Sequence, residues 1–128
     1  MTGVQTCALP IYFTKQVQIS TDFAKSAPSR LAGVEVPKWE DSESTFAELH
    51  TRIGRACDYL QSFKPAQFAG AETRALEIKL PSATLNFNGA DYLLYFALPN
   101  FYFHVTTAYD ILRHNGVDVG KRDVVGGA

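Results

Sequence analysis

Residues 45–63 read TFAELHTRIGRACDYLQSF, and this stretch decides the fold. Thr45 is followed three residues later by Glu48, which is a capping box in which each side chain bonds a free backbone N–H at the start of a helix. Behind this cap the apolar residues are spaced three and four apart, so they share one stripe of a helix. They are Phe46, Leu49, Ile53, Ala56, Leu60 and Phe63. The spacing predicts a helix that packs in a bundle and ends at Lys64-Pro65.

A similar stripe precedes this helix. Its apolar or small members are Val17, Ser20, Ala24, Ala27 and Leu31. They predict a helix from Phe13 to about Ala32, with a kink or local break at Pro28 and a stop at Gly33. We expect residues 34–44 to form a loop that Trp39 anchors to the core.

The second half of the chain alternates between two patterns. Residues 74–81, RALEIKLP, and residues 84–88, TLNFN, alternate apolar with polar side chains and predict a small β-hairpin that turns around residues 81–83. A long helix then follows from about Ala90 to Asn115, with a kink or short break at Pro99 and a stop at Gly116. We expect the glycine-rich tail from residue 120 to be frayed.

The first eleven residues, MTGVQTCALPI, carry no charge and no periodicity. With a suitable choice of codons they encode DNA that resembles a widely used short-read sequencing adapter, and Tyr12 satisfies the codon that the adapter leaves open. We therefore interpret residues 1–11 as a non-native scar and exclude them from the fold. Residues 12–128 are then one partial domain that has lost the segment before Tyr12.

Composition limits the function. With 46% hydrophobic and 20% charged residues, the chain of 128 residues is an ordinary globular protein with a single core. Its 12 Lys and Arg against 13 Asp and Glu, without a basic stripe, exclude a nucleic-acid partner. The most apolar stretch, Leu93 to Val105, is too short to cross a membrane. Cys57 is the one cysteine outside the scar, so no internal disulfide forms and we expect a cytoplasmic protein.

The densest chemistry lies in PNFYFHVTTAYDILRHNG, residues 99–116. Phe101, Val105, Ala108 and Leu112 form its apolar stripe, and Asn100, His104 and Thr107 lie along the flank of that stripe. We therefore expect His104 to face the bundle interior, either as a core histidine satisfied by hydrogen bonds or as a metal ligand or general base. The candidate cleft residues are Asn100, His104, Thr107 and Tyr109.

The remaining reactive residues favour structural roles. His50 is expected to face solvent, and His114 lies in the last helical turn, where its charged form favours the helix dipole. Cys57 is expected to be a small buried hydrophobe rather than a nucleophile. The sequence has no HExxH, CxxC, GxSxG, P-loop or GxGxxG motif. No catalytic residue is therefore assigned, and His104 is the only candidate metal ligand.

Residues 16–53, QVQISTDFAKSAPSRLAGVEVPKWEDSESTFAELHTRI, and residues 97–123, ALPNFYFHVTTAYDILRHNGVDVGKRD, resemble the uncharacterised family called domain of unknown function nineteen-ninety-three, a branch of the DinB-like superfamily. The resemblance implies a mainly all-α fold: a DinB-like four-helix bundle lacking its first helix, with a small β-hairpin between the last two helices. Three helices should then surround an exposed apolar groove.

The DinB-like superfamily is described as metalloenzymes, and some members resemble thiol-dependent transferases, which implies a divalent metal such as Zn or Ni as cofactor. Its ligand pattern is one early-helix histidine plus HxxxH on a late helix. His104 matches the second of these histidines, Asn100 stands at the first, and no early histidine lies between Tyr12 and Leu31.

Three functions remain open at this stage. The first is a small-ligand or partner-binding helical bundle in which the candidate cleft residues border the binding site. The second is a metal-dependent enzyme in which a metal held partly by His104 activates a bound water or thiol. The third is a structural homodimer unit.

Overall fold

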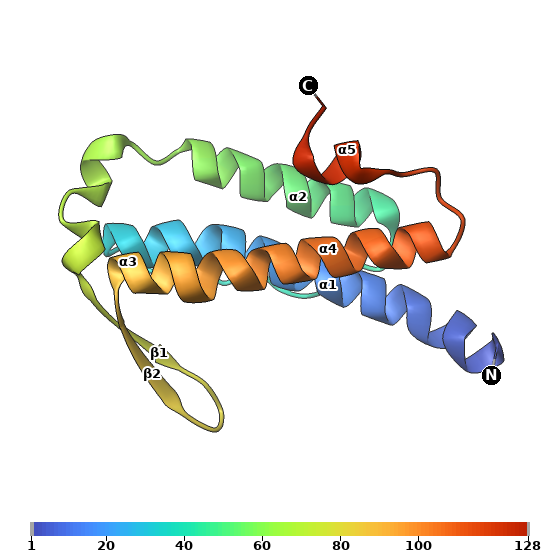
Figure 1. Cartoon of the computed structure of the whole chain (residues 1–128), viewed down its shortest axis with the longest axis horizontal. Helices are drawn as coiled ribbons and strands as arrows, with labels where there is room; N and C mark the ends of the chain where they lie inside the picture. Colours follow the sequence, from blue (N-terminus) through green and yellow to red (C-terminus); the bar gives the residue numbers. More distant parts are fainter. Residues whose placement is uncertain (1, 128) are drawn as a thin grey trace.

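The fold is a mainly helical bundle with one two-stranded antiparallel sheet (Figure 1). This computed structural model describes the backbone of residues 2–127 and the side chains of residues 12–127. The elements are α1 (Thr2–Ala32), α2 (Phe46–Gln61), the 3₁₀ turns η1 (Pro65–Phe68) and η2 (Ala71–Thr73), β1 (Ala75–Lys79), β2 (Thr84–Asn88), α3 (Gly89–Asp91), the π-helical turn η3 (Tyr92–Ala97), α4 (Leu98–His114) and α5 (Lys121–Val125). The predicted helical class with a hairpin between its helices is confirmed.

Helix α1 is longer and less interrupted than the sequence predicts. It begins at Thr2 rather than near Phe13, because an established helix gains one hydrogen bond for each residue added. How the side chains of residues 1–11 pack lies outside the described residues. The helix also continues through Pro28, where buried neighbours on both sides hold it in place. It ends as predicted at Gly33, whose φ of 70° favours glycine, and the Val34 N–H bonds the Ser29 carbonyl.

Helix α2 has the predicted start but a different buried face. The Glu48 N–H donates to the Thr45 hydroxyl at 3.1 Å, and the Glu48 carboxylate accepts from the Thr45 N–H, which confirms the capping box. The buried residues of the helix are Leu49, Arg52 and Ala56. The other predicted stripe residues Phe46, Ile53 and Leu60 are exposed. Half of the stripe therefore lacks a cover among the described residues.

The hairpin forms where the alternation predicts it. Ile78 on β1 pairs with Leu85 on β2, and Leu76 pairs with Phe87, so the apolar residues of both strands share one face. This face packs on the core cluster that contains Leu31, Ala71, Ile78, Tyr92 and Ala97. Gly89 follows the hairpin at a close approach, since a Cβ there would lie 1.7 Å from the Ala71 carbonyl oxygen.

The predicted irregularity before Pro99 is a π-helical turn. Within η3 the Leu98 N–H bonds the Leu93 carbonyl, five residues back, and Pro99 then occupies the first turn of α4. A proline has no N–H to donate to the preceding turn, so a wider turn in front of it relieves the mismatch. The Asn100 side chain donates to the Phe96 carbonyl at 2.7 Å and satisfies part of that turn. Gly116, with φ of 83°, ends α4 as predicted.

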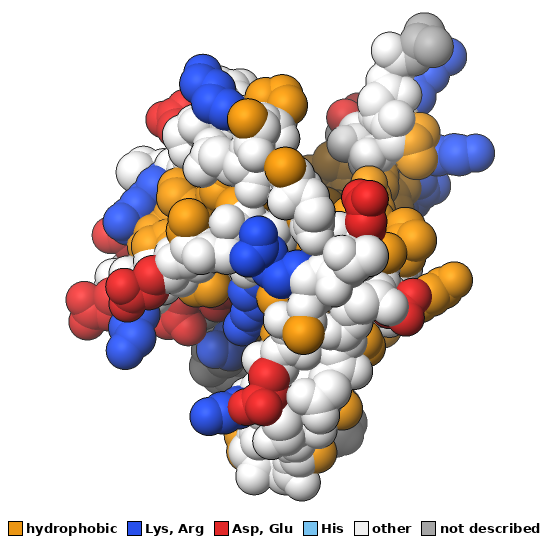
Figure 2. Space-filling model, turned by 90° about the vertical axis from the view of Figure 1, so that its left-hand side faces the viewer, with side chains coloured by type: hydrophobic (Ala, Val, Ile, Leu, Met, Phe, Trp, Pro, Cys, Tyr) orange, Lys and Arg blue, Asp and Glu red, His pale blue; other side chains and the backbone are white. Residues whose placement is uncertain are grey.

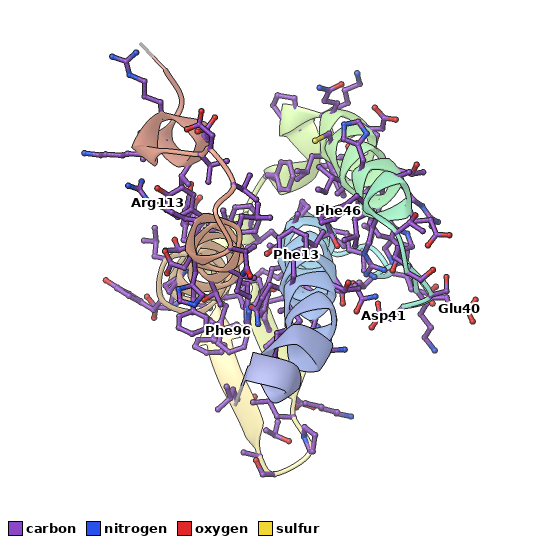
Figure 3. The ribbon with its side chains drawn as sticks, turned by 90° about the vertical axis from the view of Figure 1, so that its right-hand side faces the viewer. Phe13, Glu40, Asp41, Phe46, Phe96 and Arg113 are labelled. Carbon is purple, nitrogen blue, oxygen red and sulfur yellow. The ribbon has the colours of Figure 1, made fainter. Side chains whose placement is uncertain are left out.

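Helices α2 and α4 both pack against α1 and make few contacts with each other. Figure 3 shows this along the bundle axis, with α4 and α2 on either side of α1.

The prediction of a frayed C-terminal tail is wrong, because residues 121–125 form the helix α5. The Gly120 N–H donates to the Asp123 carboxylate, which caps this helix. None of the helices in the described part of the chain has the length and apolar character that a membrane span requires.

Candidate functional site

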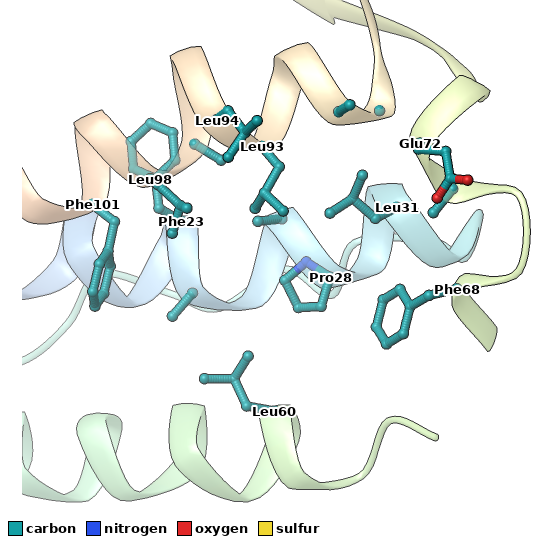
Figure 4. Close-up of a pocket in the computed structure, with 16 residues that line it drawn as sticks. Phe23, Pro28, Leu31, Leu60, Phe68, Glu72, Leu93, Leu94, Leu98 and Phe101 are labelled. Carbon is teal, nitrogen blue, oxygen red and sulfur yellow. The ribbon is translucent and has the colours of Figure 1, made fainter. Parts of the chain in front are cut away.

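An apolar groove lies between α2 and α4, with α1 as its floor. It consists of two cavities of about 600 Å³ and about 460 Å³. Ala24, Leu60 and Phe101 line both cavities, so the two form one continuous groove. Figure 4 shows the first cavity, with Leu60 of α2 facing Phe23, Pro28 and Leu31 of α1 across open space. We call this feature the α2–α4 groove.

The predicted helical stripes meet in this groove. The α4 stripe residues Phe101, Val105, Ala108 and Leu112 all line it. Ile53 and Leu60 contribute the α2 wall, and small residues of α1 leave room at the floor. In Figure 2, hydrophobic side chains gather in a hollow beside the C-terminal segment. The expected three-helix arrangement around an apolar groove therefore describes the structure.

The four candidate cleft residues fall on different sides of α4. Tyr109 lines the α2–α4 groove, and its hydroxyl accepts a hydrogen bond from Arg113 at 2.7 Å. Asn100, His104 and Thr107 are not among the residues that line the groove. The hydroxyl of Thr107 donates to the Phe103 carbonyl within the helix. The apolar stripe itself, rather than its polar flank, faces the open space.

His104 packs against α1. Its Nδ1 lies 2.6 Å from the Gln16 side-chain oxygen, and its ring stacks with the Phe23 ring at a centroid distance of 6.4 Å. Burial lowers the pKa of His104 below its ordinary value of 6.5, so the neutral ring is favoured near pH 7. A neutral His donates from one ring nitrogen, and the amide oxygen of Gln16 is the acceptor that fixes Nδ1–H.

The surroundings of His104 do not fit a divalent metal. The neighbouring groups are the Gln16 amide and the rings of Phe23 and Phe103, which leaves His104 without a second strong ligand. Among the described side chains, no three His, Cys, Asp or Glu residues come together as metal ligands. The donor set that the DinB-like resemblance implies is therefore not assembled within residues 12–127.

Two further predictions have different outcomes. His50 is exposed, as predicted. Cys57 is also exposed and lines the α2–α4 groove, so the prediction of a buried residue is wrong. The reason is the same for Cys57 as for Ile53 and Leu60: this face of α2 points toward the open groove.

The sequence analysis missed a buried polar cluster on the opposite side of α2. The Arg52 side chain is 2% exposed and lies among five oxygen acceptors from α1 and from the loop between α1 and α2. These are the Thr21 hydroxyl at 2.7 Å, the carboxylates of Asp22 at 2.9 Å, Asp41 at 3.1 Å and Glu43 at 3.1 Å, and the Glu40 carbonyl at 3.2 Å. Figure 3 shows Glu40 and Asp41 on this side of the bundle, away from α4.

Trp39 lies over the same cluster. Lys25 and Arg55 approach its ring at 4.8 Å and 4.4 Å from the centroid, and the Tyr59 ring meets it edge-on at 6.3 Å. Trp39 thus anchors the loop to both α1 and α2, as the sequence predicts. The detectable signal for the cluster was the three acidic residues within 40–43, together with Arg52 at the three-and-four spacing from Leu49 and Ala56.

Glu43 shows the electrostatic balance of this cluster. Burial opposes its charge, but hydrogen bonds from Gln18 and Arg52 and the Arg52 charge outweigh burial, so the pKa of Glu43 lies below its ordinary 4.5. The carboxylate is therefore ionised at neutral pH and pairs with Arg52. This side of the bundle is satisfied internally, in contrast to the α2–α4 groove.

Comparison with known proteins identifies the family. Residues 10–125 match the family described as Domain of unknown function (DUF1993). A solved structure described as a DinB family member protein from Shewanella denitrificans is 45% identical, with a TM-score of 0.80 over 91% of this chain. The chain spans 66% of that protein's length. None of the curated proteins compared with the chain matches it. The chain therefore belongs to the DUF1993 family and has the fold of a DinB family member.

Proposed function

We propose that this domain is a partner-binding module whose α2–α4 groove takes one amphipathic helix. The observation that carries the proposal is the continuous apolar groove between two helices that share a floor but hardly touch each other. In a helical bundle each helix buries its stripe against two neighbours, and here the stripes of α2 and α4 face the same gap.

The shape of the groove favours a helix over a small ligand. Either cavity alone has the volume of a typical small-molecule site. However, the two are continuous through Leu60 and Phe101, and α2 with its 16 residues provides a wall about 24 Å long. A helix with apolar side chains spaced three and four apart contacts such a wall along its whole length, whereas a small ligand covers one end.

The chemistry of the lining defines the partner. The walls are almost entirely apolar, so the partner presents an apolar stripe. Glu72 lines the cavity nearer the hairpin, and Asp123 lines the cavity nearer α5. A partner helix with Lys or Arg close to its ends therefore complements the groove. Of the candidate cleft residues, Tyr109 supports this proposal, since it lies in the lining.

The test compares two substitutions in α4 and the turn before it. Leu94 lines the groove and is 54% exposed, while Tyr102 is 56% exposed and does not line it. The probe is a synthetic amphipathic helix of about 18 residues with leucine on one face and lysine at both ends. Its affinity is measured by fluorescence anisotropy for the unchanged chain, Leu94→Glu and Tyr102→Glu.

We expect Leu94→Glu to weaken peptide binding at least about ten-fold, because the new carboxylate would be buried without a partner. Tyr102→Glu should bind as the unchanged chain does. Equal affinities in the two variants, or no binding by the unchanged chain, would reject the proposal. Sedimentation equilibrium separates a homodimer from a helix partner. A dimer that Leu94→Glu dissociates, with no competition from the peptide, would make a second copy the occupant.

A further inference from the structure

A separate cavity, of about 290 Å³, lies on the side of α1 that faces the hairpin. Its lining comes from α1, from β1 and the residue that follows it, from the loop between α1 and α2, and from Phe96. We call it the hairpin pocket. It shares Phe23 with the α2–α4 groove and otherwise has different residues, so it is a separate feature.

Positive charge exceeds negative charge around the hairpin pocket. Lys25, Arg30 and Lys79 line it, and Asp22 is its only carboxylate among the described residues. Asp22 is already shared, because its Oδ1 lies 2.8 Å from Lys25 Nζ and 2.9 Å from Arg52 Nη2. Of the three cations that line the pocket, Lys25 pairs with Asp22, and the charges of Arg30 and Lys79 give the pocket a positive potential that favours an anion.

Arg30 and Lys79 have N–H groups that are free to donate to a ligand. Arg30 donates one N–H to the Tyr92 hydroxyl at 3.0 Å, and a guanidinium carries five N–H donors in total. Lys79 is exposed, and its nearest carboxylate, Glu77, is 3.7 Å away on the same surface strand. Both side chains are therefore able to donate to an anion in the pocket.

Ser26 adds a hydroxyl to the polar side of the pocket. It is 8% exposed and lines the pocket, and no hydrogen bond involves its hydroxyl among the described side chains. Two other serines of α1 differ from Ser26, because the hydroxyls of Ser20 and Ser29 each donate to the carbonyl four residues earlier at 2.7 Å. No buried side-chain oxygen or nitrogen lacks a partner among the described residues, so the Ser26 hydroxyl is accessible rather than buried and unsatisfied. The Ser26 hydroxyl faces the pocket, where a ligand is able to bond it.

The rest of the lining is apolar. Phe23 and Phe96 meet edge to face at 5.9 Å, and Ile78 of β1 is buried beside them. The pocket is thus polar along one line of α1 and apolar opposite. We infer that the hairpin pocket binds a small carboxylate that carries an apolar group, with Arg30, Lys79 and Ser26 contacting the carboxylate and Phe96 and Ile78 contacting the apolar group.

Benzoate is the probe that tests this inference, because it combines a carboxylate with an aromatic ring of suitable size. Benzamide, which has the same ring without the charge, and inorganic phosphate, which has the charge without the ring, are the two reference ligands. Binding to the full chain is followed by NMR titration, with the amides of Ser26 and Lys79 as local reporters. The matched variants are Arg30→Gln, Lys79→Gln and Ser26→Val, with Lys121→Gln on α5 as the charge control.

We expect benzoate to bind more tightly than both reference ligands. Lys79→Gln should weaken it about three-fold, as for a partly exposed ion pair, and Arg30→Gln about ten-fold, as for a charged hydrogen bond. Ser26→Val should weaken it as well, and Lys121→Gln should have no effect. If Arg30→Gln unfolds the chain, the benzoate affinities of Lys79→Gln and Ser26→Val still test the inference.

Three results would overturn the inference. The first is benzamide binding as tightly as benzoate, and the second is equal behaviour of Lys79→Gln and Lys121→Gln. The third is no shift of the Ser26 amide at about 10 mM benzoate, well above the Kd of about 1 mM expected for a weak small-molecule site. Phosphate binding as tightly as benzoate would show a general anion site and would also contradict the assignment of the apolar contacts.

Discussion

The two sides of α2 differ in chemistry and in how completely they are covered. Toward α1 and the loop before it, α2 buries Arg52 among carboxylates and a hydroxyl, and every partner comes from this chain. Toward α4 it presents Ile53 and Leu60 to a groove that the described residues leave open. The first interface is polar and complete, and the second is apolar and incomplete. The polar interface is therefore satisfied within the chain, while the apolar side is available for binding.

The strongest way to break the polar interface is Arg52→Ala. The change removes the cation from three carboxylates and takes one donor from the Thr21 hydroxyl and from the half-buried Glu43. Removing one member of a buried charge pair costs about 3–5 kcal/mol, and we expect a loss in this range. Urea denaturation measures it, with the exposed Arg122→Ala on α5 as the control. A loss below about 1 kcal/mol, which is typical of surface ion pairs, would contradict this account.

A pair of leucines on α2 sharpens the comparison. Leu49 is buried against α1, and Leu60 lines the open groove. Leu49→Ala should cost about 3 kcal/mol, because it creates a cavity in a closed interface. Leu60→Ala should cost about 1 kcal/mol, since part of that side chain is already in water. Equal losses in thermal or urea unfolding would mean that the groove is closed in solution.

Glu43 makes the polar interface sensitive to acid. Its pKa in the folded chain is below the ordinary 4.5, so its stabilising contribution is fully present above pH 4.5 and is lost as the pH falls through the lowered folded pKa. Glu43→Gln should therefore flatten the fall in unfolding free energy on the acid side of pH 4.5. The slope that remains in the variant includes Glu48, whose pKa is lowered chiefly by the Ser44 N–H. An unchanged slope in Glu43→Gln would show that Glu43 does not interact with Arg52 in solution.

The N-cap of α2 contributes less than its buried face. Thr45→Ala removes the acceptor of the Glu48 N–H and should cost about 1 kcal/mol. Thr51→Ala on the same helix is the matched control, because its hydroxyl bonds only the Ala47 carbonyl in an exposed turn. Circular dichroism during urea unfolding gives both values. The control should lie within about 0.5 kcal/mol of the unchanged chain, and a Thr45→Ala value in the same range would show that the cap contributes nothing measurable.

Local features of this fold could be predicted from the sequence. The capping box at Thr45, the glycine stops at Gly33 and Gly116, and the hairpin depend on neighbours within a few residues, and all were confirmed. The three-and-four spacing also identified the apolar faces of the helices. It could not show which faces are covered, because cover depends on partners distant in the sequence. Cys57 and Ile53 were therefore expected inside and are exposed.

The burial of Arg52 was not predicted for a related reason. Arg52 lies three residues after Leu49 and four before Ala56, so the spacing allows its burial, but a charged residue is expected to stay in water. Its burial follows from the acidic loop that folds over it, which periodicity does not detect. For the candidate site, the α4 stripe predicted the groove wall. Tyr109 lines the groove and His104 does not, because the His104 side chain bonds Gln16 of α1.

The smallest expected effect concerns the beginning of the chain. Residues 2–11 extend α1 as helix, and the family match begins at residue 10. If residues 1–11 are non-native, as their sequence indicates, they did not evolve with the interfaces of α2 and should contribute little to them. Removing residues 1–11 should change the unfolding free energy by less than about 0.5 kcal/mol, the usual range for changes away from structural features. Phe13, whose ring centroid lies 5.7 Å from that of Phe46, should be retained in the shortened chain.

Calorimetric unfolding of the full and shortened chains gives the difference in unfolding free energy. Phe13→Ala in the full chain serves as the reference, because it shows how much the loss of one real contact changes stability. A decrease of many degrees in Tm on trimming would mean that residues 1–11 cover part of the apolar side, and the contrast between the two sides of α2 would then be smaller than the structure indicates.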